Sequence, residues 1–182
     1  MTVQKDINGK LILSDKQIDM TVQRIINKKA KHKTITFTTS INGKEVIVVK
    51  YHKLIDLDML SPSSRRKITK RYILRAFEGS AVKTANGRTV TIKSTGGANK
   101  MHFQSKQNIT FFIDDLIRNS VFFKSGPDYY DNRVIWLYYN SYFELNGVIT
   151  RVLINFKEAG ETLSFYDVNK IKEVDMSATL NR

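Results

Sequence analysis

The sequence predicts an α+β protein in which about three helices accompany a twisted antiparallel sheet built from hairpins. Asn-Gly dipeptides, each followed by alternating apolar residues, supply the positive φ angles that two-residue hairpin turns require. They stand at residues 8–9, 42–43, 86–87 and 146–147. Apolar residues spaced three and four apart predict helices over about 14–31, 61–78 and 108–120. Because these helices precede or interrupt a run of hairpins, the pattern favours the α+β class.

The first helix is expected to begin at Ser14 or Asp15, since both residue types are good N-caps. Its apolar face consists of Ile18, Val22, Ile25 and Ile26. The helix ends in the basic run KKAKHK, which the helix dipole stabilises at this end. The same run offers candidate nucleic-acid contacts at Lys28, Lys29, Lys31 and Lys33. A hairpin over residues 34–40 and 45–51 follows.

The second helix opens at Ser61-Pro62 and stops before Gly79. Its apolar stripe contains Ile68, Tyr72, Ile73 and Phe77. The other faces carry cations, with no acidic residue before Glu78: Arg65, Arg66, Lys67, Lys70, Arg71 and Arg75. A merely solvated helix usually mixes charge signs for pairing. We therefore expect several of these cations to project outward, either to contact phosphates or simply to keep the surface soluble.

The stretch from Lys83 to Ser120 is the centre of the predicted fold. A hairpin turn at Asn86-Gly87 leads into a strand with Val90 and Ile92, and Gly96-Gly97 ends that strand. A short strand carrying His102 comes next. The third helix then begins at the predicted N-cap Asn108, and its apolar face contains Ile109, Phe112, Ile113, Leu116 and Ile117.

The C-terminal part is rich in aromatic residues and is expected to complete the sheet. A loop over 125–132 precedes a long hairpin, 133–145 and 148–156, and a final strand, 163–168. Most aromatic side chains here are expected in the core or in cross-strand pairs, with one or two free to stack on bases. They are Tyr129, Tyr130, Trp136, Tyr138, Tyr139, Tyr142 and Phe143. We predict a basic helix–hairpin–helix region over 1–79 that is packed on or appended to an α+β domain over 80–174, and a frayed tail over 175–182.

Charge is the strongest compositional signal in this chain of 182 residues, which has 30 Lys and Arg against 17 Asp and Glu. Residues 1–110 hold 22 basic and 7 acidic side chains, a net charge of +15, whereas residues 111–182 have a net charge of −2. This asymmetry indicates a polyanionic partner, although a generally basic soluble surface is the alternative. With no cysteine, no signal-peptide pattern and no long apolar run, we expect a soluble cytoplasmic protein without membrane contact.

Metal and cofactor chemistry is not predicted. The three histidines lie in different elements without ligand spacing, and no nucleotide-binding or zinc-protease motif occurs. Asp114 and Asp115 are adjacent on a helix, so we do not expect both to point at one ion. His102, with Lys100 and Arg88 on neighbouring segments, is the one candidate for metal-free acid–base chemistry on RNA. The competing interpretation is that His102 is an ordinary strand residue.

Short motifs in residues 80–174 resemble large polyvalent-protein-associated domains of phages and mobile elements, which are grouped with the barnase, EndoU and RelE type of nuclease fold. The motifs are G-R-x-V-x-I at 87–92, K-M-H-F at 100–103, L-I-x-N at 116–119, N-G-V-x-x-R-V at 146–152 and Phe165-Tyr166. The resemblance implies a helix followed by a twisted antiparallel sheet, with nuclease activity carried only by His102 and its basic neighbours. The chain departs from the pattern in lacking a second nearby histidine and in its basic N-terminal part.

The leading functional hypothesis is a non-enzymatic mobile-element protein that binds nucleic acid or a ribonucleoprotein and inhibits a host defence. In character, though not in motif, such a chain is similar to anti-CRISPR proteins that block Cas9-type effectors, whose channels are positively charged. A basic inhibitor would bind the nucleic acid or an acidic face of the complex. The alternative is a metal-independent endoribonuclease that uses His102. A sequence-specific transcription factor is less favoured, because no helix-turn-helix spacing is found.

Overall fold

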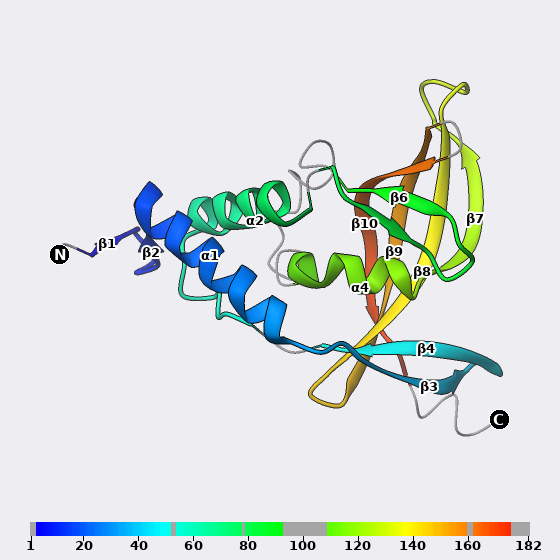
Figure 1. Cartoon of the computed structure of the whole chain (residues 1–182), viewed down its shortest axis with the longest axis horizontal. Helices are drawn as coiled ribbons and strands as arrows, with labels where there is room; N and C mark the ends of the chain where they lie inside the picture. Colours follow the sequence, from blue (N-terminus) through cyan, green and yellow to red (C-terminus); the bar gives the residue numbers. More distant parts are fainter. Residues whose placement is uncertain (1–2, 52–53, 78, 93–108, 160–161, 176–182) are drawn as a thin grey trace.

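The computed structural model describes residues 3–51, 54–77, 79–92, 109–159 and 162–175 (Figure 1). The predicted Gly96-Gly97 loop, the strand with His102 and the N-cap Asn108 lie outside these residues, as does most of the predicted C-terminal tail. The remaining elements confirm the predicted α+β class.

Two helices form the N-terminal part of the fold. Helix α1 (Asp15–Lys31) begins with a capping box, in which the Ser14 hydroxyl accepts a hydrogen bond from the Gln17 amide, 3.2 Å, and the Gln17 side chain accepts one from the Ser14 amide, 2.8 Å. Helix α2 (Pro62–Phe77) begins after Ser61, whose hydroxyl accepts a hydrogen bond from the Ser64 amide, 3.2 Å. Both predicted starts are confirmed, because a serine at each position satisfies an otherwise unpaired amide.

All four Asn-Gly dipeptides lie in connections between paired antiparallel strands, but only those at 42–43 and 146–147 form the predicted two-residue turns, because five residues separate the strands of the other two pairs. The pairs are β1 (Gln4–Lys5) with β2 (Leu11–Ile12), β3 (Ile35–Ile41) with β4 (Lys44–Lys50), β5 (Ala81–Lys83) with β6 (Thr89–Thr91), and β8 (Ile135–Leu145) with β9 (Val148–Ala159). Asn42 and Asn146 have φ angles of 52° and 53°, the left-handed conformation that these turns need.

The main sheet has the order β3-β4-β8-β9-β10-β6-β5, with β10 (Thr162–Glu173) next to β9, and β7 (Val121–Pro127) pairs separately with β8. The hairpin pattern predicted a wholly antiparallel sheet, but two of its strand pairs are parallel. Strand β4 runs parallel to β8, and β6 runs parallel to β10. Hairpins can be read from local turns, but how one hairpin lies beside another depends on distant segments. The sheet is therefore mixed.

Three further boundaries differ from the prediction. The predicted loop over 125–132 is shorter, because residues 125–127 still pair with β8 as the end of β7. The last strand extends to Glu173, well beyond residue 168, and irregularities in its pairing at 165–167 and 168–170 break the apolar alternation there. The third helix is shorter than expected and consists of a 3-10 turn, η2 (Thr110–Phe112), followed by α4 (Ile113–Arg118).

Helix α4 lies in the hollow of the curled sheet, with α1 and α2 beside it (Figure 1). The Ser141 hydroxyl of β8 donates a hydrogen bond to the Leu116 carbonyl of α4, 2.8 Å, so alternate residues of β8 face this helix. One main core combines apolar side chains of α1, α2, α4 and the sheet, among them Val22, Tyr72, Phe112, Tyr139 and Phe156. Within the described residues, no helix is both long and apolar enough to cross a membrane.

Candidate nucleic-acid interface

The outer face of α2 carries three exposed cations, Arg66, Lys67 and Lys70. Lys70 lies three residues after Lys67 and four after Arg66, so it shares one side of the helix with both. None of them forms an ion pair within the described part of the chain. We call these three residues the α2 basic face. Arg65, also a predicted contact, is half-buried, and its Nε has no hydrogen-bond partner among the described residues.

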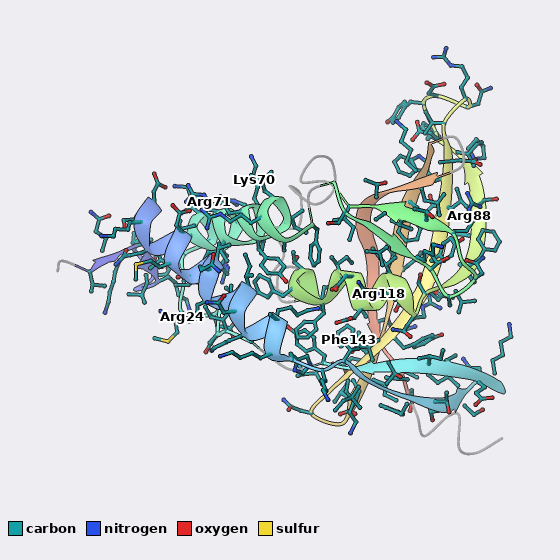
Figure 2. The ribbon with its side chains drawn as sticks, in the orientation of Figure 1. Arg24, Lys70, Arg71, Arg88, Arg118 and Phe143 are labelled. Carbon is teal, nitrogen blue, oxygen red and sulfur yellow. The ribbon has the colours of Figure 1, made fainter. Side chains whose placement is uncertain are left out.

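Arg71 and Arg75 do not project freely from α2, contrary to expectation. The Arg71 guanidinium contacts the carboxylates of Asp19, 2.8 Å, and Asp15, 3.2 Å, and Arg75 contacts Asp19, 2.8 Å. These contacts join α2 to α1 along the seam between them. The acidic partners were missed because they lie on a different helix, whereas sequence patterns show only pairs within one helix. In the view of Figure 2, Lys70 lies on the outer side of α2 and Arg24 on the opposite side of the helix pair.

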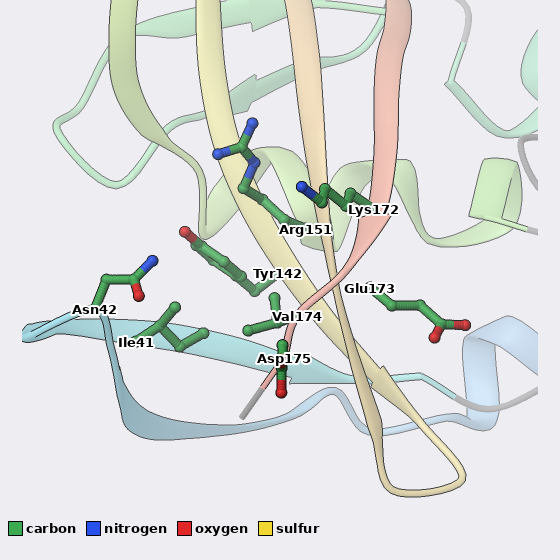
Figure 3. Close-up of a pocket in the computed structure, with 8 residues that line it drawn as sticks. All are labelled: Ile41, Asn42, Tyr142, Arg151, Lys172, Glu173, Val174 and Asp175. Atoms are coloured by element: carbon green, nitrogen blue, oxygen red, sulfur yellow. The ribbon is translucent and has the colours of Figure 1, made fainter. Parts of the chain in front are cut away.

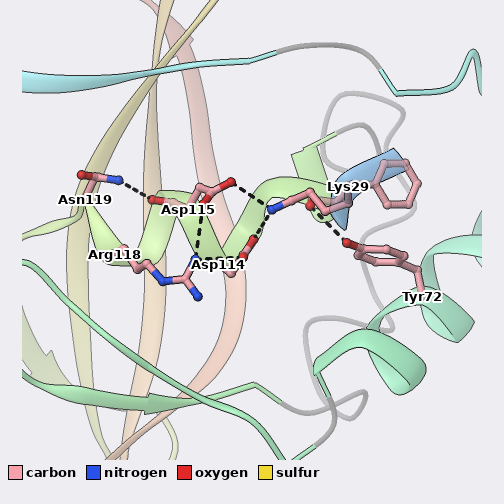
Figure 4. Close-up of polar contacts among 7 residues, drawn as sticks. Lys29, Tyr72, Asp114, Asp115, Arg118 and Asn119 are labelled. Carbon is pink, nitrogen blue, oxygen red and sulfur yellow. Dashed lines mark hydrogen bonds and ion pairs between the residues drawn. The ribbon is translucent and has the colours of Figure 1, made fainter. Parts of the chain in front are cut away.

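Lys29 is also engaged inside the protein. Its ammonium contacts Asp114, 3.0 Å, and Asp115, 2.9 Å, and both carboxylates also contact the Arg118 guanidinium (Figure 4). The expectation that these adjacent carboxylates would not share one ion is wrong, because the long Lys29 side chain reaches the helix from the side, between them. The aspartate side chains are only 11% and 5% exposed, so the cluster joins α1 to α4 in a largely dry environment.

The exposed face of α1 forms a shallow groove of about 370 Å³. Its lining contains three cations and no acid: Met20, Gln23, Arg24, Asn27, Lys28 and Lys31. The Lys28 ammonium donates a hydrogen bond to the Leu54 carbonyl, 3.2 Å, while Lys31 and Lys33 are exposed. Of the basic run at the end of α1, Lys28, Lys31 and Lys33 therefore remain accessible to a polyanion.

The residues of the predicted ribonuclease site are only partly placed. His102 and Lys100 lie outside the described residues. Arg88 is half-buried and, with Glu158 and Tyr139, lines a groove of about 380 Å³ between β7 and the β5–β6 hairpin. Among the described residues, no group of three His, Cys, Asp or Glu side chains is arranged to hold a metal ion.

The aromatic residues divide between the core and the surface. Tyr139 and Phe143 are buried, whereas Tyr129 and Tyr130 are each 91% exposed in the loop after β7. On β7 itself, Phe122 and Phe123 are 46% and 48% exposed. Sequence patterns did not single out Phe123, since an aromatic residue after a helix is usually part of the core.

Phe123 lies between a cation of its own strand, Lys124, and a cation of β9, Arg151. The Lys124 Nζ is 5.8 Å from its ring centroid and 5.2 Å from that of Tyr138, and the Arg151 guanidinium is 5.9 Å from the Phe123 ring. Arg151 faces Tyr142 across β8 and β9, a pairing that the Asn146-Gly147 turn makes readable from the sequence. The approach of β7 to Arg151 was not readable, because it depends on how β7 pairs with β8.

Comparison with known proteins finds no matching family model, no matching curated protein and no matching solved structure.

Proposed function

We propose that this protein is a non-enzymatic nucleic-acid-binding protein that inhibits a host-defence ribonucleoprotein, such as a Cas9-type effector, by binding its nucleic acid. The observation that supports this proposal is the α2 basic face, where Arg66, Lys67 and Lys70 are exposed with no ion pair in the described part of the chain. Clustered cations without neighbouring acids repel one another, and phosphate groups relieve that repulsion while releasing their counterions.

The basic groove of α1 supports the same proposal. Its cations Arg24, Lys28 and Lys31, together with Lys33, give the helix pair a second positive surface, on α1. Contacts of this kind position a protein on the phosphate backbone without reading base sequence. We therefore expect affinity to depend strongly on salt and weakly on base composition.

The binding test uses fluorescein-labelled RNA and DNA and fluorescence anisotropy over a range of salt. If about five phosphates are contacted, log K against log salt has a slope of roughly −4 to −5. Replacing Arg66, Lys67 and Lys70 together with Gln is expected to weaken binding at physiological salt by orders of magnitude and to flatten the slope by up to about three.

A matched control removes the same charge elsewhere. Lys44, Lys83 and Lys157 are exposed cations on three strands of the sheet, away from α2. The Lys44→Gln/Lys83→Gln/Lys157→Gln variant has the same net charge as the α2 variant, so we expect it to bind nearly as tightly as the wild type. Equal losses in both variants would show that only net charge matters, and salt-independent binding would overturn the proposal.

The inhibitory role is tested separately. Cleavage of a target duplex by a Cas9–guide RNA complex is measured while the protein concentration rises, and we expect cleavage to fall for the wild type and not for the α2 variant. Tight binding to nucleic acid without loss of cleavage would remove the inhibitory part of the proposal and leave the binding part standing.

Metal-independent endoribonuclease activity is the second candidate function, favoured by the groove that Arg88 and Glu158 share. A guanidinium that stabilises phosphorane charge and a carboxylate that takes up a proton are components of such a reaction. Incubation with RNA in EDTA tests it: cleavage is expected to be lost in His102→Ala and in Arg88→Gln. Intact RNA after incubation with the wild-type protein would rule this candidate out.

A further inference from the structure

A row of residues crosses the sheet on the side opposite to α4. Lys172 of β10 pairs with Arg151 of β9, Arg151 pairs with Tyr142 of β8, and Tyr142 pairs with Val48 of β4. Because the neighbouring Ser141 faces α4, Tyr142 faces away from it. The row therefore places two cations directly opposite each other on the outer face of the sheet.

Two like charges in directly opposed positions destabilise a sheet unless an anion lies between or above them. Neither Arg151 nor Lys172 forms an ion pair within the described part of the chain. A cavity of about 260 Å³ lies beside them, lined also by Asn42, Tyr142, Glu173 and Asp175. In Figure 3 the Glu173 carboxylate points away from the two cations, and Asp175 lies at the far end of the cavity.

Polar groups of this cavity can donate hydrogen bonds to an anion. Burial raises the pKa of the Tyr142 hydroxyl, while the nearby Arg151 guanidinium acts in the opposite direction. The hydroxyl is therefore protonated at neutral pH and is a donor. In the view of Figure 3 this hydroxyl points toward the side chain of Asn42, which also lines the cavity.

Aromatic rings adjoin Arg151 and a further cation, Lys124. Phe123 lies at an irregularity in the pairing of β7 with β8, where its ring is 48% exposed and is next to Arg151 and Lys124. Lys124 also lies over the ring of Tyr138. We name these residues the outer strip: Phe123, Lys124, Tyr138, Tyr142, Arg151 and Lys172. Its composition, flat rings alternating with unpaired cations, is that of surfaces that bind single-stranded nucleic acid.

We propose that the outer strip binds unpaired nucleotides, with a base stacked on Phe123 and a phosphate held by Arg151 and Lys172. Only single strands offer their base faces to a ring, so this site is expected to prefer single-stranded RNA or DNA to duplex. The inference rests on the proposed nucleic-acid binding and adds a second surface, on the sheet, to the basic surfaces of α1 and α2.

Phe123→Leu is the first test variant, and Phe122→Leu is its matched control. Both residues lie on β7 and are nearly equally exposed, but the Phe122 ring packs against Tyr139 on the inner side of the sheet, 5.7 Å between ring centroids. Anisotropy is measured with a labelled oligonucleotide as a single strand and as a duplex. We expect Phe123→Leu to weaken single-strand binding roughly 5- to 100-fold, and Phe122→Leu to leave it unchanged.

The phosphate contacts are tested with the Arg151→Gln/Lys172→Gln variant. We expect its salt slope for single strands to be flatter by about 1.4, since each contact contributes about 0.7. Lys44→Gln/Lys83→Gln removes the same charge from two other exposed positions of the sheet and is expected to keep the wild-type slope. Circular dichroism spectra that match the wild type confirm that each variant is folded.

The outcomes separate this inference from the proposed function. Loss of single-strand binding in the strip variants, with duplex binding retained, supports the outer strip. Both Phe123→Leu and Arg151→Gln/Lys172→Gln could bind single strands like the wild type while the variant of the α2 basic face does not. In that case the proposed binding site on the outer strip is wrong and the proposed function stands. If the wild type binds neither probe, both are overturned, and a protein partner on β7 becomes the better explanation of the exposed rings.

Discussion

At the scale of single residues, Lys29 differs from its basic neighbours in its effect on the fold. It is the cation of α1 that faces inward, where it contacts two nearly buried carboxylates and lies 5.2 Å from the Phe112 ring. When a buried carboxylate loses its cationic partner, the free-energy cost of removing it from water is no longer offset by the attraction between the charges. The ion cluster is therefore expected to matter for stability, while Lys28, Lys31 and Lys33 remain available for binding.

We predict that Lys29→Met lowers the free energy of unfolding by about 3 kcal/mol, because Asp114 and Asp115 are then left with Arg118 alone. The free energy of unfolding is measured by urea titration, with circular dichroism as the signal. Lys28→Met, at an exposed neighbouring position, is the control and is expected to cost less than about 1 kcal/mol. Adding Asp115→Asn to Lys29→Met should recover part of the loss. A Lys29→Met variant as stable as the wild type would contradict the assignment of the cluster as a structural contact.

Asp128 is a second residue whose chemistry can be tested on its own. The indole N–H of Trp136 donates a hydrogen bond to its carboxylate, 2.8 Å, and the amides of Tyr130 and Asp131 donate two more, 3.0 and 3.1 Å. The Trp136 hydrogen bond, followed by that of the Tyr130 amide, lowers the pKa of Asp128 below its usual value. These hydrogen bonds stabilise the ionised form of the half-buried carboxylate.

Because the pKa of Asp128 is lower in the folded than in the unfolded protein, its stabilising effect is present above the unfolded pKa and is lost as the pH falls through the folded one. Trp136 is the single tryptophan, so its fluorescence reports this change. We predict a fluorescence transition with a midpoint below the usual Asp pKa of about 3.9. Asp128→Asn should abolish the transition and Asp131→Asn should keep it, since Asp131 is bound instead to Arg133, 3.0 Å. A transition that persists in Asp128→Asn would assign it to another group.

At the scale of elements, the seam between α1 and α2 determines which cations of α2 are free. Asp19 accepts contacts from Arg71 and Arg75, and Asp15 accepts one from Arg71. The side chains are 30–75% exposed, so each pair contributes modestly and is screened by salt. Arg71 and Arg75, two of the predicted phosphate contacts, are therefore engaged in the seam, and the α2 basic face points away from α1.

We predict that Arg71→Ala lowers the free energy of unfolding by about 1 kcal/mol at low salt and by less in molar salt. Lys70→Ala, at the adjacent exposed position, should change it by less than about 0.5 kcal/mol. Urea unfolding at the two salt concentrations measures both. Asp19→Asn should cost a similar amount, and combining it with Arg71→Ala should cost less than the sum, since both changes break one contact. Strict additivity would show that Arg71 and Asp19 do not interact in solution.

At the scale of the whole molecule, the basic N-terminal region and the C-terminal sheet share one core. Phe111 packs against Tyr72, 4.9 Å between ring centroids, and Phe112 packs against Tyr51, 4.4 Å. Strand β4 also pairs with β8 in the main sheet. The boundary predicted at residue 79 therefore falls inside a continuous hydrophobic core.

We predict that a fragment starting at residue 80 does not fold cooperatively. It lacks α1, α2, β3 and β4, so Phe111, Phe112 and one edge of β8 would be exposed to water. Broad NMR amide signals, binding of a hydrophobic dye and a gradual urea transition are the expected results. A sharp transition and well-dispersed signals would instead establish residues 80–182 as an independent domain.

The sequence by itself determined the local structure of this protein. The hairpins at the four Asn-Gly dipeptides, the helix starts at Ser14 and Ser61 and the apolar faces of α1 and α2 were all predictable. Caps and turns depend on backbone angles and on hydrogen bonds among residues a few positions apart, so the information lies within each segment. The exposure of Arg66, Lys67 and Lys70 was predictable for the same reason, as they oppose the apolar stripe of their own helix.

Only the tertiary structure decided which distant groups meet. The parallel pairing of β4 with β8, the contact of Lys29 with Asp114 and Asp115, and the approach of Phe123 to Arg151 all join segments that are far apart in the chain. Apolar periodicity shows which face of an element is buried but not what it is buried against. A charged side chain likewise carries no local sign of its partner, so the sequence marked the cations and the fold determined which of them are free.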